Sequence, residues 1–187
     1  YYTFYKNKEK FKSKSNIWLY WENKPNKKKP IYLDLCLDTV YKHCSNDFNI
    51  HLLDEKNVYN YIPELRKDIN NLNIPQKTDY IRLVLLYKYG GIWLDSDIIV
   101  MNSLYPIIEK LKKYEYVGFG CHYKNCRNTG YPKPANWVMA SRKNGILMKK
   151  FINKSDKILD KLNHKSINLK SNYFILGRKL IWKEIEN

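Results

Sequence analysis

The segment QKTDYIRLVLLYKYGGIWLDSDIIV, residues 76–100, contains the pattern that decides the fold. Its first part, residues 76–89, is apolar on most faces and predicts a deeply packed helix, which Gly90 is placed to stop. Gly91 permits a tight entry into IWLDSDIIVM, which predicts a strand, a kink at two aspartates and a continuing strand. The acidic pair is therefore expected where a central strand ends.

Asp95 and Asp97 lie one residue apart in this otherwise apolar run. Alternate side chains of an extended segment share a face, so both carboxylates are expected on the same side. At about 6 Å and an effective dielectric near 20 they repel by roughly 3 kcal/mol, which water, protonation or a cation must relieve. The apolar neighbours argue against a hydrated turn, and oxygen ligands select Mg²⁺ or Mn²⁺. The pair favours a cation that binds a diphosphate; a capped turn or pairing with lysines is the plainer alternative.

Strands and helices alternate along the rest of the chain. The expected strands cover residues 16–21, 45–55, 115–120 and 136–141. The expected helices cover residues 30–44, 58–61, 63–69, 104–114, 144–159 and 171–185, the last interrupted near Gly177. This alternation predicts one α/β domain over residues 1–187 with a mostly parallel central sheet, its core in 16–150 and C-terminal helices in 151–187.

The composition indicates a folded, strongly basic protein. Among 187 residues, 34 Lys and Arg against 18 Asp and Glu give a formal charge of +16, which attracts nucleotide phosphates, nucleic acid, acidic polysaccharide or a membrane surface. The lysines are spread along the chain, so a composition bias explains the charge equally well.

No apolar run is long enough to span a membrane and no signal peptide is visible, so we expect a cytoplasmic protein or one peripheral to a membrane. The four cysteines lack paired zinc spacing; we expect reduced thiols, with CHYKNC (121–126) open as half a metal site or a bridged loop.

Asp79 and Arg82 extend the acidic motif onto the preceding helix. They are three residues apart and share a face with Leu86 and Gly90, which leads toward the acidic pair. Arg82 would serve a phosphate or a pairing carboxylate, and Asp79 a hydroxyl. The alternative is an i,i+3 ion pair between the two.

These residues carry a resemblance. TDYIRLVLLYKYGGIWLDSD, residues 78–97, resembles the signature of the capsular polysaccharide synthesis family and of related glycosyltransferases with a D-x-D sugar-binding region, which include the glucosyltransferase domains of large clostridial toxins. NIWLYWENKP is similar to the family's first strand, and NWVMAS to a later strand that begins with Asn and an aromatic residue. The resemblance spans about residues 16–150, and its central block is the diagnostic part.

The resemblance implies a GT-A fold, as in nucleotide-diphospho-sugar transferases. It implies transfer of a sugar from a nucleotide-diphosphate donor, a UDP-sugar, to a glycan or other hydroxyl acceptor, with Mn²⁺ or Mg²⁺ and retention of anomeric configuration. Carried over by position, Trp21 stacks on the base, Asp79 and Arg82 hold the donor sugar and diphosphate, and Trp93 lines the ribose and sugar pocket. Asp95 contacts ribose or metal-bound water, Asp97 ligates the metal, and Asn136 approaches the transferred sugar. The catalytic set is then Asp95, Asp97 and Arg82, with Asp97 and Asp95 at the metal.

Three other functions are compatible with parts of the sequence. A basic nucleic-acid-binding module would use the charge and the 17 tyrosines, but no known binding motif is present, so no specific nucleic acid is expected. A nucleotidyltransferase is disfavoured because WENKPNKKKP contains no glycine for a phosphate loop. A degenerate transferase that binds its donor without turnover stays open because the C-terminal part is short. His164, Asn168 and Asn172 are conceivable stand-ins for a diphosphate contact from the chain's end.

Overall fold

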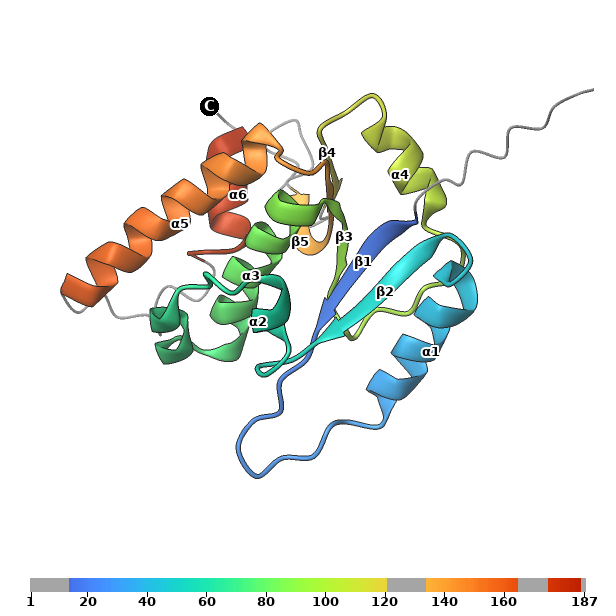
Figure 1. Cartoon of the computed structure of the whole chain (residues 1–187), viewed down its shortest axis with the longest axis horizontal. Helices are drawn as coiled ribbons and strands as arrows, with labels where there is room; N and C mark the ends of the chain where they lie inside the picture. The colour runs from blue at the N-terminus through green and yellow to red at the C-terminus, as the bar shows by residue number, and fades with distance from the viewer. Residues whose placement is uncertain (1–13, 121–133, 165–174, 186–187) are drawn as a thin grey trace, which may run out of the picture.

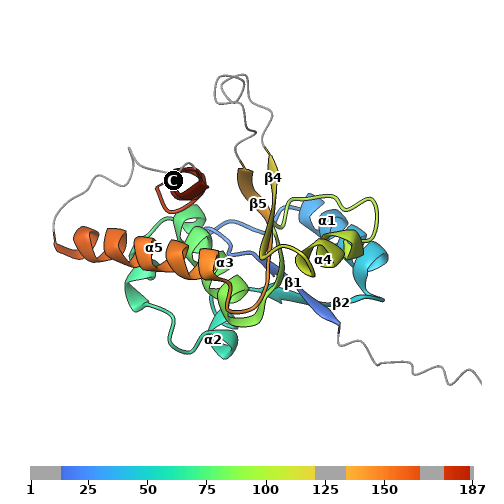
Figure 2. The same cartoon turned by 90° about the horizontal axis from the view of Figure 1, so that it is seen from above.

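The computed structural model describes residues 14–120, 134–164 and 175–185. Its strands are β1 (Ser15–Tyr20), β2 (Phe48–Leu53), β3 (Gly91–Leu94), β4 (Tyr116–Gly120) and β5 (Pro134–Ser141). Its helices are α1 (Tyr32–Cys44), α2 (Val58–Tyr61), α3 (Ile74–Tyr89), α4 (Tyr105–Leu111), α5 (Ile146–His164) and α6 (Arg178–Ile185), with a 3₁₀ turn, η1, at Lys67–Asn71. The sheet separates α1 and α4 on one face from α3 and α5 on the other (Figures 1 and 2).

The strands form one sheet in the order β2-β1-β3-β5-β4. β1 is parallel to β2 and to β3, whereas β5 is antiparallel to both of its neighbours, β3 and β4. Four strands therefore run in one direction and β5 opposes them. This architecture confirms the predicted α/β class with a mostly parallel central sheet.

Both faces of the central strands are buried. Trp18 and Trp93 belong to the hydrophobic core under α3, whereas Ile17 and Ile92 belong to the core under α1 and α4. Strands buried on both faces are expected to be continuously apolar, as IWLY and GIWL are. The carboxyl ends of the parallel neighbours β1 and β3 therefore lie side by side in a well-packed sheet.

Helix α3 is bounded by residues suited to their positions. The Asn73 side chain accepts a hydrogen bond from the Gln76 backbone N–H, and Pro75 occupies the first turn, so the helix begins two residues earlier than predicted. At its end Gly90 has φ 68° and Gly91 φ 101°. A Cβ on Gly91 would lie 2.3 Å from the backbone oxygen of Asn16, so β1 approaches too closely for any larger residue.

Three predicted elements differ from the structure. The strand that was predicted to continue beyond the acidic pair stops at Leu94, because the chain turns there and Val100 N–H then bonds to Thr39 Oγ1 of α1 at 3.0 Å. The helix predicted over 63–69 is replaced by η1, since Arg66 has a non-helical ψ of 125° and breaks the helical path. Of the helix predicted over 171–185, the described part is a turn at 175–177 followed by α6.

Two further expectations concern membranes and thiols. Within the described ranges, no helix combines the length and apolar character that a membrane span requires. Cys36 and Cys44 are free and buried, as expected of reduced thiols, and the CHYKNC segment lies outside the described residues.

Candidate functional site

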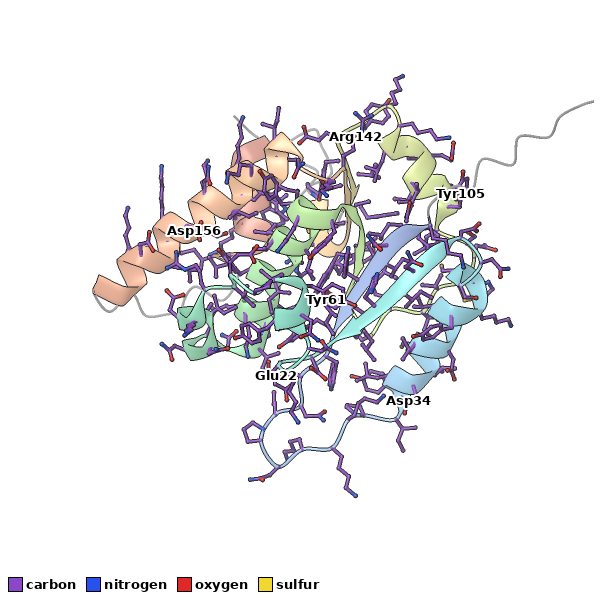
Figure 3. The ribbon with its side chains drawn as sticks, viewed as in Figure 1. Glu22, Asp34, Tyr61, Tyr105, Arg142 and Asp156 are labelled. Carbon is purple, nitrogen blue, oxygen red and sulfur yellow. The ribbon has the colours of Figure 1, made fainter. Side chains whose placement is uncertain are left out.

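A cleft of about 650 Å³ lies where β1 and β3 end. Its walls are the loop that follows β1, the first turns of α3 and the turn that follows β3. Glu22, which lines it, lies at the opposite end of the molecule from Arg142 (Figure 3). The lining residues are Tyr20, Trp21, Glu22, Asn23, Lys24, Lys27, Lys28, Pro30, Ile74, Pro75, Thr78, Arg82, Asp95, Ser96 and Asp97. Ligands of open α/β sheets bind at this edge, beyond the carboxyl ends of the strands.

The acidic pair occupies the turn at the floor of this cleft. Asp95 N–H donates to the Trp137 carbonyl of β5 (2.9 Å), and Ser96 Oγ donates to the Tyr20 carbonyl at the end of β1 (2.8 Å). The pair therefore lies in a turn and not in the extended segment that the sequence predicts, so the two carboxylates do not share a strand face. Both residues nevertheless line the cleft. Asp97 is exposed and makes no hydrogen bond or ion pair with any residue in the described ranges.

Arg82 connects the acidic turn with α3. Its side chain is 5% exposed and bridges Asp79 Oδ1 (3.1 Å) and Asp95 Oδ1 (3.2 Å). The guanidinium lies 5.0 Å from the centroid of Trp93 and donates to the Asn136 carbonyl. The i,i+3 ion pair considered as an alternative is thus present, and Arg82 also reaches the acidic turn and the cleft. A planar fork with five N–H groups is what makes several simultaneous partners feasible.

Asp79 lies behind Arg82 and is nearly inaccessible. Its Oδ1 accepts a hydrogen bond from Asn136 Nδ2 at 2.7 Å. Burial raises the pKa of Asp79 to about 6; neighbouring Asp95 also raises it, and Arg82 opposes the shift. Burial likewise raises the pKa of Asp95, against the opposing effects of Arg82 and of the Trp93 hydrogen bond. The buried Asp79 carboxyl and the partly exposed Asp95 carboxylate thus share one guanidinium.

The predicted site residues form two layers. Trp21, Arg82, Asp95 and Asp97 line the cleft, and Trp21 Nε1 donates to Asn23 Oδ1 at 2.9 Å. Behind them lie the other three predicted residues: Asp79, Trp93 and Asn136.

Trp93 was expected to line the pocket, but it is fully buried beneath it. Its Nε1 donates to Asp95 Oδ1 at 2.8 Å, and its ring lies under the guanidinium of Arg82. The indole therefore orients the first carboxylate of the acidic pair from below.

Several residues of the site were not singled out from the sequence. The cleft is also lined by Lys24, Lys27 and Lys28. The sequence does not distinguish these three from the other lysines, because lysine is spread evenly along the chain. Gly177, in the turn before α6, contacts the back of the site: a Cβ there would lie 2.4 Å from Asp79 Oδ2 and 2.7 Å from Asn136 Nδ2. The sequence marks this glycine only as an interruption of the last predicted helix, because its contact partners belong to α3 and β5.

An aromatic pair lies beside the acidic turn. The β4–β5 ladder is irregular, with Gly118 opposite Met139 but Gly120 opposite Pro134, so β5 bulges in between. A bulge re-aims the side chains it contains. Trp137, within it, is partly exposed, and its ring centroid is 6.0 Å from that of Phe119.

The donor set for a cation consists of two carboxylates. In the described part of the chain, no group of three or more His, Cys, Asp or Glu side chains is placed to hold a metal ion. Among the described residues Asp97 has no hydrogen-bond or ion-pair partner, and the contacts of Asp95 with Trp93 and Arg82 there are made through Oδ1. One or two carboxylates fit Mg²⁺ or Mn²⁺, which complete their shells with water and substrate phosphates, and do not fit an all-protein cage.

Known proteins resemble this chain in family and in fold. The chain has the fold of a solved structure described as PaToxG glycosyltransferase, with a TM-score of 0.58 and 18% sequence identity over 91% of this chain and 68% of that one. No curated protein matches it. The family model for capsular polysaccharide synthesis proteins matches residues 2–176. The chain therefore belongs to the capsular polysaccharide synthesis protein family and has a glycosyltransferase-like fold.

Proposed function

We propose that this member of the capsular polysaccharide synthesis protein family is a metal-dependent glycosyltransferase with a GT-A fold. It moves a sugar from a UDP-sugar to a hydroxyl group of a glycan or polysaccharide. One observation carries the proposal: a single cleft at the end of the central strands collects an aromatic ring, three lysines and Asp97, a carboxylate without a hydrogen bond or ion pair among the described residues. Retention of the anomeric configuration is supported by the resemblance of residues 78–97 to the toxin glucosyltransferase domains.

The nucleotide binds along the β1 side of the cleft in this proposal. Trp21 offers a flat face for a base, a contact of about 1–3 kcal/mol. Lys24, Lys27 and Lys28 make no hydrogen bond or ion pair with described residues through their side chains, so their charges are available to phosphates. The base of this loop is held in place because Glu22 Oε2 accepts from Tyr20 Oη and from Lys77 Nζ, each at 2.6 Å.

The diphosphate faces the acidic turn. Asp97, with Asp95 beside it, would hold Mn²⁺ or Mg²⁺, which when bound supplies the positive charge that neutralises a diphosphate leaving group. Arg82 fixes Asp95 through the 3.2 Å ion pair and contributes its own charge at the cleft wall. Trp93 and Asn136 keep Arg82 in place, so the charged groups need little rearrangement when a donor binds.

The acceptor approaches from the β5 side. Sheet order places β5 next to β3 on the side away from β1, so the Phe119–Trp137 pair lies beyond the acidic turn from Trp21. Sugar rings present apolar C–H faces that pack on exposed aromatic side chains. We assign this pair to the acceptor glycan, with the scissile bond between it and the diphosphate.

The proposal is tested by thermal shift against UDP-, GDP- and CDP-sugars, each with Mn²⁺ and with EDTA. A ligand that binds only the native state raises the melting temperature by mass action. We expect a shift with UDP-sugars that requires the cation. Release of UDP in the presence of glycans measures turnover, and NMR of the anomeric proton of the product tests retention.

Each outcome has a distinct meaning. Cation-dependent binding without UDP release under any condition would identify a donor-binding protein that has lost catalysis. Absence of any nucleotide-sugar shift, together with tight, salt-sensitive binding of a nucleic acid, would overturn the proposal.

A further inference from the structure

An apolar strip lies on the solvent side of α1, next to the cleft. Ile31, just before the helix, is 88% exposed, and Leu35 is 58% exposed. Four residues apart, they lie one turn above the other on the same side. The buried side of α1 is formed by other positions, Leu33, Cys36, Val40 and Cys44. Neither Ile31 nor Leu35 is therefore needed for the core.

The segment that follows the acidic turn adds two more apolar side chains. The hydrogen bond from Val100 N–H to Thr39 Oγ1 holds this segment against α1, one turn beyond Leu35. Val100 is buried, whereas its neighbours Ile99 and Met101 are 53% and 72% exposed. We call Ile31, Leu35, Ile99 and Met101 the outer ridge. Single exposed apolar residues are ordinary, but a group of aliphatic side chains next to a ligand cleft marks a contact surface.

The loop before the outer ridge is densely basic. Residues 24–29 contain four lysines, of which Lys29 is paired with Asp34 in the first turn of α1. Figure 3 shows Glu22 and Asp34 at the same end of the molecule, where this loop leads into α1. Positive charge therefore flanks the apolar side chains on the loop side, whereas exposed Asp38 lies three residues after Leu35 on α1. This is the arrangement of proteins that lie on anionic lipid, where aliphatic groups enter the interface and lysines meet the headgroups.

We propose that the outer ridge and the lysine loop dock this protein on an anionic lipid bilayer, with the cleft open beside the membrane surface. Lys24, Lys27 and Lys28 line the cleft as well, so lipid headgroups and donor phosphates share these lysines. This inference deepens the proposed function, because a membrane-held glycan would then be presented to the cleft. A second copy of the chain is the disfavoured occupant, since two surfaces of a protein with net charge +16 repel each other. Each lysine near an anionic surface is expected to strengthen binding about five-fold.

The test is co-sedimentation of the protein with vesicles of phosphatidylcholine, with and without about one third phosphatidylglycerol. We expect binding only to the anionic vesicles, and weaker binding as salt rises. The double variant Ile31→Ser, Leu35→Gln should lose at least about ten-fold in vesicle affinity. Serine is favourable at a helix start and glutamine within a helix, so the fold is retained, which the melting temperature verifies. The matched control is Ile146→Ser, which removes a similarly exposed isoleucine (67%) from the start of α5 on the other side of the sheet.

The inference fails if the wild-type protein ignores anionic vesicles, or if the double variant binds them as well as Ile146→Ser does. It also fails if the double variant changes a dimer into a monomer in size-exclusion chromatography, because the ridge would then be a contact between copies. UDP and Mn²⁺ binding is measured on the same preparations. Vesicle binding without UDP binding would refute the proposed enzyme and leave the docking surface intact. UDP binding without vesicle binding would refute the docking surface and leave the proposed enzyme intact.

Discussion

Replacement of Asp97 by alanine should separate cation binding from folding. The side chain is exposed and has no described partner, so its loss should change the free energy of unfolding by less than about 0.5 kcal/mol. Its charge adds to the repulsion at Asp95 when no cation is bound and becomes favourable when a cation is present. A unit charge about 4 Å from a divalent ion in water-like surroundings contributes about 2 kcal/mol, twice the value for two unit charges. Mn²⁺-dependent UDP affinity should therefore fall at least about 30-fold, and more if a carboxylate oxygen ligates directly.

The assay is titration calorimetry of UDP with Mn²⁺ and again with EDTA, together with Mn²⁺-dependent donor hydrolysis. We expect the variant to bind UDP equally weakly under both conditions and to show no hydrolysis. Asp38→Ala serves as the control, because Asp38 is another exposed aspartate of this basic protein and lies on α1 outside the cleft. If Asp97→Ala kept both the cation-dependent affinity and the hydrolysis, the assignment of the acidic turn to a metal would be wrong.

The remaining predictions concern the layer behind the cleft. Arg82→Ala leaves Asp79 and Asp95 unpaired and should cost about 3 kcal/mol in urea unfolding as well as weakening UDP binding; an unchanged urea midpoint would contradict this. The raised pKa of Asp79 means that the folded protein holds a proton between about pH 4 and 6 that the unfolded chain releases. Asp79 therefore stabilises the folded protein by about 3 kcal/mol below pH 4, and this stabilisation is lost as the pH rises to about 6. Asp79→Asn should flatten the melting temperature over that window, and an unaltered pH profile would exclude Asp79 as its source. Gly177→Ala should lower the free energy of unfolding by about 1–3 kcal/mol and reduce donor binding, because its Cβ would collide with Asp79 and Asn136. If the variant kept wild-type stability and binding, the turn would be able to shift without cost.

The central helix and strand were predictable because local and long-range requirements coincide there. A short, continuously apolar run that follows two glycines favours a strand buried on both faces, and the two glycines suit a sharp reversal, in which both have positive φ. The course of the chain after Leu94 was not predictable. Ile98 and Ile99 are as suited to a strand as Ile92, but the segment is held by the hydrogen bond that Val100 N–H donates to Thr39 Oγ1 on α1, and no feature of the segment itself encodes that acceptor.

The candidate site was likewise predictable only in part. The position of Asp95 and Asp97 at the end of β3 follows from the strand, whereas their turn depends on the Trp137 carbonyl of a strand distant in sequence. Trp93 illustrates an ambiguity of residue type, because a tryptophan in a strand suits a ligand pocket or a core equally well. Only the packing of Arg82 over its ring shows that it supports the pocket from below.

The close contact of Gly177 with Asp79 and Asn136 has a consequence for how this protein matures. Residue 177 is added to the growing chain after α3 and β5, so the arrangement of both side chains cannot be completed until this glycine has been synthesised. Premature termination or proteolytic trimming upstream of this glycine should therefore yield a chain that keeps its acidic turn but leaves these two partners without their cover.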